Sequence, residues 1–105
     1  MAFKWEVVRM RGYRKDPERI EVRVLQRHVR LSGARVLEIG CGDGRLTRRI
    51  LGSTRSVLGV DPNGTAIARA RQLTAGAKAT FQIATADDLS VPDHSFDVAL
   101  LSWSL

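Results

Sequence analysis

Short apolar runs alternate with amphipathic segments along most of the chain. The runs at 35–40 (RVLEIG), 56–61 (SVLGVD), 79–85 (ATFQIAT) and 96–104 (FDVALLSWS) have the length and composition of buried parallel strands. The segments at 44–51 (GRLTRRIL) and 63–76 (NGTAIARARQLTAG) repeat their apolar residues at helical spacing. Strands that alternate with helices predict an α/β fold, a Rossmann-like and mostly parallel sheet of about four strands with flanking helices.

Two further features refine this picture. In the second helical segment, Asn63 is expected to cap the helix, and Ala66, Ala70 and Leu73 to form its inner face. Nearer the N-terminus, residues 16–31 (DPERIEVRVLQRHVRL) predict another helix, because an aspartate and a proline suit its first turn.

The composition fits one small globular unit. The chain has 105 residues, of which 44% are hydrophobic and 27% charged. Cys41 is the only cysteine, which rules out an intramolecular disulfide and a thiolate metal cluster, and we expect no metal site. The longest apolar run, at 98–101, is too short to span a membrane, and the first residues lack the apolar middle of a signal peptide. We therefore expect a cytoplasmic protein.

The positive charge is concentrated at one end. Residues 1–35 contain ten basic and four acidic side chains, whereas residues 36–105 contain seven of each. We therefore divide the chain into a basic N-terminal segment, 1–34, and a second unit, 35–105. Within the predicted helix one stripe of arginines contains Arg19, Arg23, Arg27 and Arg30. A solvated face explains this stripe better than nucleic-acid binding, since no aromatic side chain interleaves it to stack bases.

Three glycines follow the first predicted strand on alternate positions. Gly40, Gly42 and Gly44 permit a tight turn and leave room for a ligand against the main chain. A dinucleotide fingerprint needs a further glycine where Arg45 or Thr47 stands. The second strand ends in an aspartate at position 61, and a carboxylate there suits the paired hydroxyls of a ribose. The pattern indicates a small-molecule site at the carboxyl ends of the strands.

These motifs together resemble the class I S-adenosylmethionine-dependent methyltransferases, of the type called methyltransferase domain 11. The resemblance covers Arg35 to Ser104, in the stretches VLEIGCGDGRLT, VLGVDPNGTAIARAR and ATADDLSVPDHSFDVALLS. It implies that S-adenosylmethionine is the cofactor, that its methionine part lies against the glycine loop, and that its ribose and adenine lie near the ends of the next two strands. The implied cofactor-binding residues are Glu38, Gly40, Cys41, Gly42, Gly44, Asp61, Pro62, Asp87, Asp88 and Leu89.

Several of these residues also have a structural explanation. Asp61 can cap the following helix, and Glu38 can support the loop without touching a ligand. Asp87 and Asp88 are adjacent, so either can meet adenine and either can be an ordinary turn residue. Cys41 is expected to contribute mainly backbone, and Asp97 to be structural.

The resemblance implies methyl transfer to an unidentified acceptor, with a small molecule favoured. The fourth strand ends in LSWSL, unlike the Asn-Pro-Pro-Tyr type of sequence found in methyltransferases that act on adenine or glutamine amino groups. No catalytic residue can be named. A complete domain of this family has seven strands, so this chain looks truncated and whether it is an active enzyme is open.

The missing strands suggest two further possibilities. The fourth strand is central in the family, so we expect it to form an open edge here, through which copies of the chain associate. The alternative function is a non-catalytic binding or assembly module that uses the arginine stripe to engage nucleic acid or an acidic partner.

Overall fold

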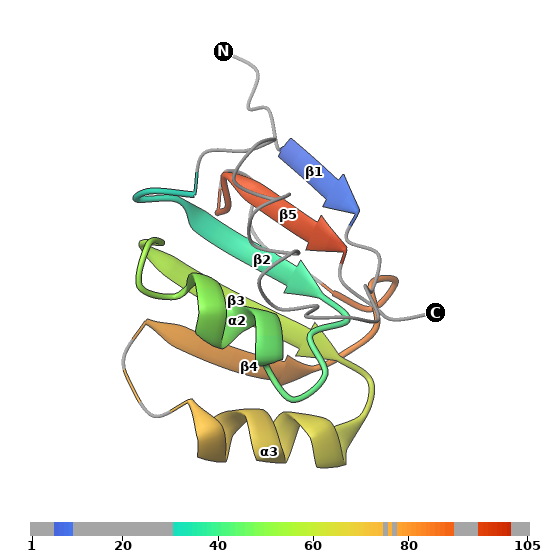
Figure 1. Ribbon diagram of the computed structural model, residues 1–105. Coiled ribbons are helices and arrows are strands. Elements are labelled where there is room, and N and C mark those ends of the chain that lie inside the picture. The colour runs from blue at the N-terminus through green and yellow to red at the C-terminus, as the bar shows by residue number, and fades with distance from the viewer. Residues whose placement is uncertain (1–5, 10–30, 75, 77, 90–94, 102–105) are drawn as a thin grey trace.

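The computed structural model describes residues 6–9, 31–74, 76, 78–89 and 95–101. These residues form one sheet of five parallel strands in the order β1-β5-β2-β3-β4, together with two helices (Figure 1). The elements are β1 (Glu6–Arg9), β2 (Arg35–Ile39), α2 (Arg45–Ile50), β3 (Ser56–Asp61), α3 (Gly64–Leu73), β4 (Ala79–Ile83) and β5 (Val98–Leu101). The predicted α/β, Rossmann-like fold is confirmed.

The core is divided between the two faces of the sheet, because successive side chains of a strand point to opposite sides. One face packs against α2, where Val36, Val57 and Leu100 meet Leu46 and Ile50. The other face carries a separate cluster, formed by Leu37, Val60 and Phe96 with partly buried residues that include Ala84 and Leu89. Glu38 is two residues beyond Val36 in β2, so its side chain lies on the helix-covered face.

Helix α3 begins as predicted but turns a different face to the core. The Asn63 side chain accepts a hydrogen bond from the Ala66 N–H at 3.1 Å, which confirms the expected cap. Ile67 and Ala70 are fully buried, whereas Leu73 is 47% exposed. The expected inner face of Ala66, Ala70 and Leu73 is therefore wrong in part, because the buried stripe is centred on Ile67 and Ala70.

Gly59, in the middle of β3, lies close to side chains of β4 and of the glycine loop. A Cβ atom there would stand 2.8 Å from Phe81 Cδ1 and 2.9 Å from Cys41 Sγ, closer than such atoms pack. Glycine at this position therefore lets the Phe81 ring and the Cys41 thiol fill the space between β3 and α3.

The expected open edge at the fourth predicted strand is wrong. That strand, β5, pairs with β2 on one side and with β1 on the other, where Glu6 faces Val98 and Arg9 faces Leu101 (Figure 1). Strand β1 was not predicted from the sequence. Because β1 satisfies the second row of β5 backbone groups, the argument for association through a β5 edge no longer holds.

The arginine stripe and most of the predicted helix at 16–31 lie outside the described residues, as does the end of the strand predicted at 96–104. No described helix has both the length and the apolar character that crossing a membrane requires.

Candidate functional site

The glycine loop lies where the strand order of the sheet reverses. From β2 the chain passes to β3 and then β4 on one side, whereas β5 lies on the other side of β2. In open α/β sheets ligands bind beyond the carboxyl ends of the strands at such a point. The loop at 40–44 joins the carboxyl end of β2 to α2 and therefore occupies this position.

The three loop glycines all adopt left-handed backbone angles. Their φ values are 82° at Gly40, 56° at Gly42 and 82° at Gly44, a region that other residues enter only at a cost. A Cβ at Gly44 would be 3.3 Å from the Phe81 ring, so packing also favours glycine there. A Cβ at Gly42 would meet no atom within 4 Å, so this part of the loop borders open space.

Main-chain hydrogen bonds tie the loop to the end of β3. The Val60 carbonyl accepts from the N–H groups of Gly40 and Cys41, at 2.8 and 3.1 Å. The N–H of Gly44 donates to the Cys41 carbonyl at 3.0 Å. These three N–H groups already donate to acceptors within the chain. They are not free to bind a ligand, but the loop still lets a ligand come close to the main chain.

Asp61 holds the middle of the same loop. Its Oδ2 accepts a hydrogen bond from the Gly42 N–H, and its Oδ1 accepts one from the Asn63 N–H, both at 2.9 Å. The helix cap itself is Asn63, so Asp61 is not simply a cap. Each carboxylate oxygen has a second acceptor position, and the Asp61 side chain is only partly buried. The carboxylate can therefore accept two more hydrogen bonds from a ligand.

Glu38 and Thr47 form a contact that the sequence analysis missed. The Thr47 hydroxyl donates to Glu38 Oε1 at 2.5 Å, and the two residues are 0% and 1% exposed. A signal was present, because Thr47 is a polar residue that adjoins the apolar face of its helix. Glu38 is thus directed toward the first turn of α2.

Cys41 is a buried, protonated thiol rather than a reactive one. Burial raises its pKa to about 12, and the negative charges of Glu38 and Asp61 act in the same direction. Both carboxylates therefore lie close enough to the loop to act on its central residues. The Cys41 side chain fills space against Gly59, in agreement with a mainly structural role for the sulfur.

The segment after β4 carries the remaining predicted residues to the same end of the sheet. Leu89 packs against the cluster of Leu37 and Val60, which places this segment beside the ends of β2 and β3. Asp88 accepts a hydrogen bond from the Thr85 hydroxyl at 3.0 Å and donates its own N–H to the Thr85 carbonyl at 3.2 Å. Asp87 is exposed, as is Pro62 after β3.

Asp97 lies at the opposite end of the sheet, before β5. Its carboxylate accepts from the Arg35 N–H at 2.9 Å and from the Arg35 guanidinium at 3.1 and 3.2 Å. Asp97 also donates its own N–H to the Arg35 carbonyl. These bonds fix the amino ends of β2 and β5 to each other, so the role of Asp97 in this structure is structural.

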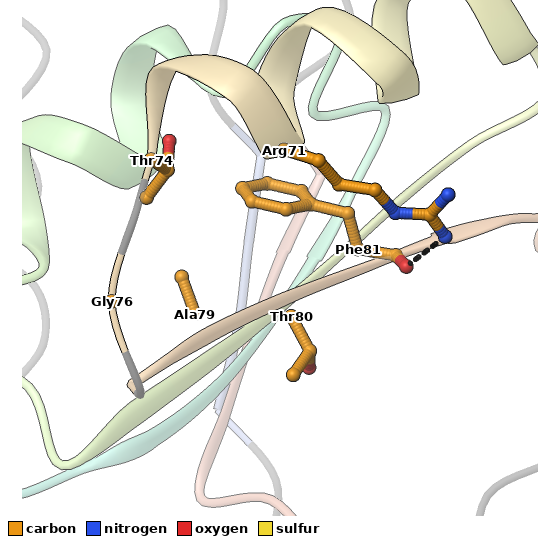
Figure 2. A pocket seen from close by; sticks show the side chains of 6 residues that line it. All are labelled: Arg71, Thr74, Gly76, Ala79, Thr80 and Phe81. Atoms are coloured by element: carbon orange, nitrogen blue, oxygen red, sulfur yellow. Dashed lines mark hydrogen bonds between the residues drawn. The ribbon is translucent and has the colours of Figure 1, made fainter.

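A surface hollow of about 380 Å³ also lies away from the loop (Figure 2). It is lined by the end of α3 and the first residues of β4, including Arg71, Thr74 and Phe81. Arg71 Nη2 donates to the Phe81 carbonyl at 2.8 Å within it. The hollow is lined by the first half of β4, whereas the candidate site is at the carboxyl ends of the strands. Phe81 belongs to the lining and also contacts the loop, because a Cβ at Gly44 would be 3.3 Å from its ring.

The described residues contain no cluster of three or more histidine, cysteine or acidic side chains that could hold a metal ion. At the loop itself the structure places the Asp61 carboxylate, close-packed main chain and an adjoining open space.

Comparison with known proteins gives a consistent result. A family model described as a methyltransferase domain matches residues 36–105. A ubiquinone biosynthesis O-methyltransferase of Rhizobium rhizogenes is 36% identical over 72 residues, which is 67% of this chain and 29% of that protein. This chain thus spans less than a third of the length of that relative.

Solved structures share the fold. An S-adenosylmethionine-dependent methyltransferase from Mesorhizobium loti superimposes with a TM-score of 0.67 and 30% identity, over 74% of this chain and 36% of that one. Phosphoethanolamine N-methyltransferase 1 of Haemonchus contortus, solved with phosphoethanolamine and S-adenosylhomocysteine, gives a TM-score of 0.70 and 27% identity, over 76% and 17%.

Proposed function

This chain belongs to the S-adenosylmethionine-dependent methyltransferases, and from that premise we propose that residues 35–105 are the cofactor-binding part of such an enzyme. The observation that carries this proposal is the hydrogen bond between the Asp61 carboxylate and the Gly42 N–H. This bond holds a carboxylate at the end of β3, where it suits the hydroxyls of a ribose, against the glycine loop. The loop glycines have left-handed backbone angles, and the loop borders open space at Gly42.

We assign the cofactor contacts from this geometry. Asp61 accepts from the ribose hydroxyls with its remaining acceptor positions, and Pro62 lies beside the ribose. Glu38 and the loop from Gly40 to Gly44 hold the methionine part, with Cys41 contributing backbone. Among the residues after β4, we assign the adenine amino group to Asp87, as the family resemblance implies. The Asp88 carboxylate holds the Thr85 hydroxyl with Oδ2 but keeps other acceptor positions, so substitutions have to separate the two residues. Leu89 and the backbone of Asp88 lie beside the adenine ring.

The chemistry follows from the nature of this cofactor, which supplies a methyl group already activated on a sulfonium. The residues of this chain then have to bind and orient the cofactor, because alignment of the reacting groups is the main requirement for such a transfer. We assign no general base among the described residues.

The acceptor is proposed to be a small molecule. The names of two similar proteins support this class, one an O-methyltransferase of ubiquinone biosynthesis and the other a phosphoethanolamine N-methyltransferase. The non-catalytic module that uses the arginine stripe has less support, because the matched residues, 36–105, do not include that stripe. A cytoplasmic location is part of the proposal and agrees with the free thiol of Cys41; cell fractionation tests it.

Calorimetric titration tests the proposed cofactor. We expect S-adenosylhomocysteine, the demethylated product of the cofactor, to bind the chain and NAD not to bind. NAD is the matched comparison because it shares the adenosine part but requires a different glycine spacing. Binding of NAD without binding of S-adenosylhomocysteine contradicts the proposal.

A further inference from the structure

The contact between Thr47 and Glu38 connects the two sides of the glycine loop. Glu38 is the fourth residue of β2, before the loop, and Thr47 is in the first turn of α2, after it. The Thr47 Oγ1 atom donates to Glu38 Oε1 at 2.5 Å, at a place from which solvent is excluded.

Such a contact restricts where the carboxylate can point. A buried carboxylate is costly unless its oxygens accept hydrogen bonds, and a hydroxyl donor at this distance forms one of the stronger, charge-assisted kind. The threonine side chain has few alternatives, because β-branching leaves it about two rotamers in a helix and Thr47 is fully buried. The direction of Glu38 Oε1 is therefore set by a residue of α2.

The charge of Glu38 acts on the loop. Burial is the main reason for the raised pKa of the Cys41 thiol, and the negative charge of Glu38 adds to it, which places the Glu38 carboxylate near the start of the loop. The methionine part of S-adenosylmethionine carries positive charge at its ammonium and sulfonium groups and negative charge at its carboxylate. S-adenosylhomocysteine lacks the sulfonium but keeps the ammonium, which is therefore the group that a carboxylate of the protein recognises in both molecules. Glu38 is directed toward the first turn of α2 and is almost fully buried, so it acts on the ammonium group by attraction and not by an open contact. The adenosine part carries no charge and is little affected.

We propose that Thr47 is a positioning residue, which holds the Glu38 carboxylate for recognition of the amino-acid part of the cofactor. The inference rests on the proposed function and deepens it. Loss of the Thr47 hydroxyl then weakens ligands that contain the amino acid and spares ligands that contain only the adenosine part.

Two ligands and three variants test this selectivity by calorimetry. S-adenosylhomocysteine contains the amino acid, whereas methylthioadenosine lacks it. Thr47→Val removes the hydroxyl and keeps the shape, Thr47→Ser keeps the hydroxyl, and Thr54→Val is the matched control. Thr54 is also buried, 3% exposed, and its hydroxyl donates to the Leu51 carbonyl at 3.2 Å, away from Glu38.

We expect Thr47→Val to lose about tenfold or more in affinity for S-adenosylhomocysteine, the effect of one hydrogen bond to a charged group. Its affinity for methylthioadenosine should be unchanged, and Thr47→Ser and Thr54→Val should bind both ligands as the unsubstituted chain does. If Thr47→Val does not fold, Glu38→Gln must show the same selective loss, since it retains an acceptor for Thr47 but no charge.

Other outcomes overturn the inference. The contact would be purely structural if Thr47→Val lost the same affinity for both ligands. The same conclusion would follow if Thr54→Val lost as much affinity as Thr47→Val, or if Thr47→Ser failed to retain binding. If the unsubstituted chain binds methylthioadenosine and S-adenosylhomocysteine but Thr47→Val and Glu38→Gln bind both unchanged, only this inference fails. If the unsubstituted chain binds neither ligand, the proposed function is wrong, and the inference about Thr47, which depends on it, is wrong as well.

Discussion

The Asp61 carboxylate accepts a hydrogen bond from the Gly42 N–H at 2.9 Å, across 19 residues of sequence. This bond joins the end of β3 to the loop that follows β2. Because the same carboxylate also holds the Asn63 N–H, one side chain organises the loop, the start of α3 and, in our proposal, the ribose.

Replacement of Asp61 tests both roles. Asp61→Ala should weaken S-adenosylhomocysteine binding by about 1.5 to 3 kcal/mol, the range for hydrogen bonds to a charged group. It should also lower the free energy of unfolding by about 1 kcal/mol, because the Gly42 N–H loses its acceptor. Asp61→Asn is the matched control, since it keeps one acceptor oxygen and should lose less stability. Calorimetry and urea unfolding measure the two effects, and unchanged affinity in both variants contradicts the ribose assignment.

Alanine at Gly42 tests whether a ligand lies against the loop. Gly42 and Gly33 both have left-handed angles, φ 56° and 69°, and a Cβ at either meets no atom within 4 Å. Gly42→Ala and Gly33→Ala should therefore cost similar stability, about 1 kcal/mol each. Only Gly42→Ala should weaken S-adenosylhomocysteine binding, by at least about tenfold, because its methyl group enters the proposed site. Equal affinity in the two variants would show that the ligand does not approach Gly42.

The two adjacent aspartates after β4 can be told apart by amide substitution. Asp87→Asn should reduce the affinity for S-adenosylhomocysteine about tenfold, because an exposed acceptor of the adenine amino group loses its charge. Asp88→Asn retains an oxygen for the Thr85 hydroxyl and should bind nearly as well as the unsubstituted chain. The reverse order of affinities in calorimetry would assign adenine to Asp88 instead.

The pairing of Asp97 with Arg35 predicts a dependence of stability on pH. The hydrogen bonds from Arg35 hold the pKa of Asp97 below its usual value of 3.8. A lowered pKa in the folded state stabilises the fold at pH values above the unfolded pKa, and this contribution is lost as the pH falls through the folded one. Urea midpoints of the unsubstituted chain and Asp97→Asn should differ at pH 6 and approach each other only as the pH falls below 3.8 and through the lower, folded pKa. A difference that stays equal over this whole range would exclude the carboxylate as the cause.

The elements from residue 35 onward could be predicted because each has a local signal. The strands β2 and β3 are apolar runs that end beside glycine or aspartate, and α3 has an asparagine cap that the structure confirms. The loop glycines are a local signal as well, because glycine is the residue that adopts left-handed backbone angles without strain. Their spacing differs from that of the dinucleotide fingerprint and so distinguished the cofactor class.

The inner face of α3 could not be fixed in the same way. The apolar residues of α3 would allow the helix to be rotated about its axis in more than one way. The position of Phe81 in β4 decides which face of the helix packs against the sheet. Ile67 and Ala70 join Phe81 in one cluster, and Leu73 is turned to solvent.

Strand β1 and the Thr47–Glu38 contact depended on tertiary structure alone. The four residues EVVR have no glycine or proline boundary and lie in a charged stretch, so only their pairing with β5 defines them as a strand. Strand pairing joins residues far apart in the chain, which local pattern does not encode. In the same way, Thr47 and Glu38 are separate features of the sequence, and the turn at Gly40–Gly44 brings the two side chains into contact.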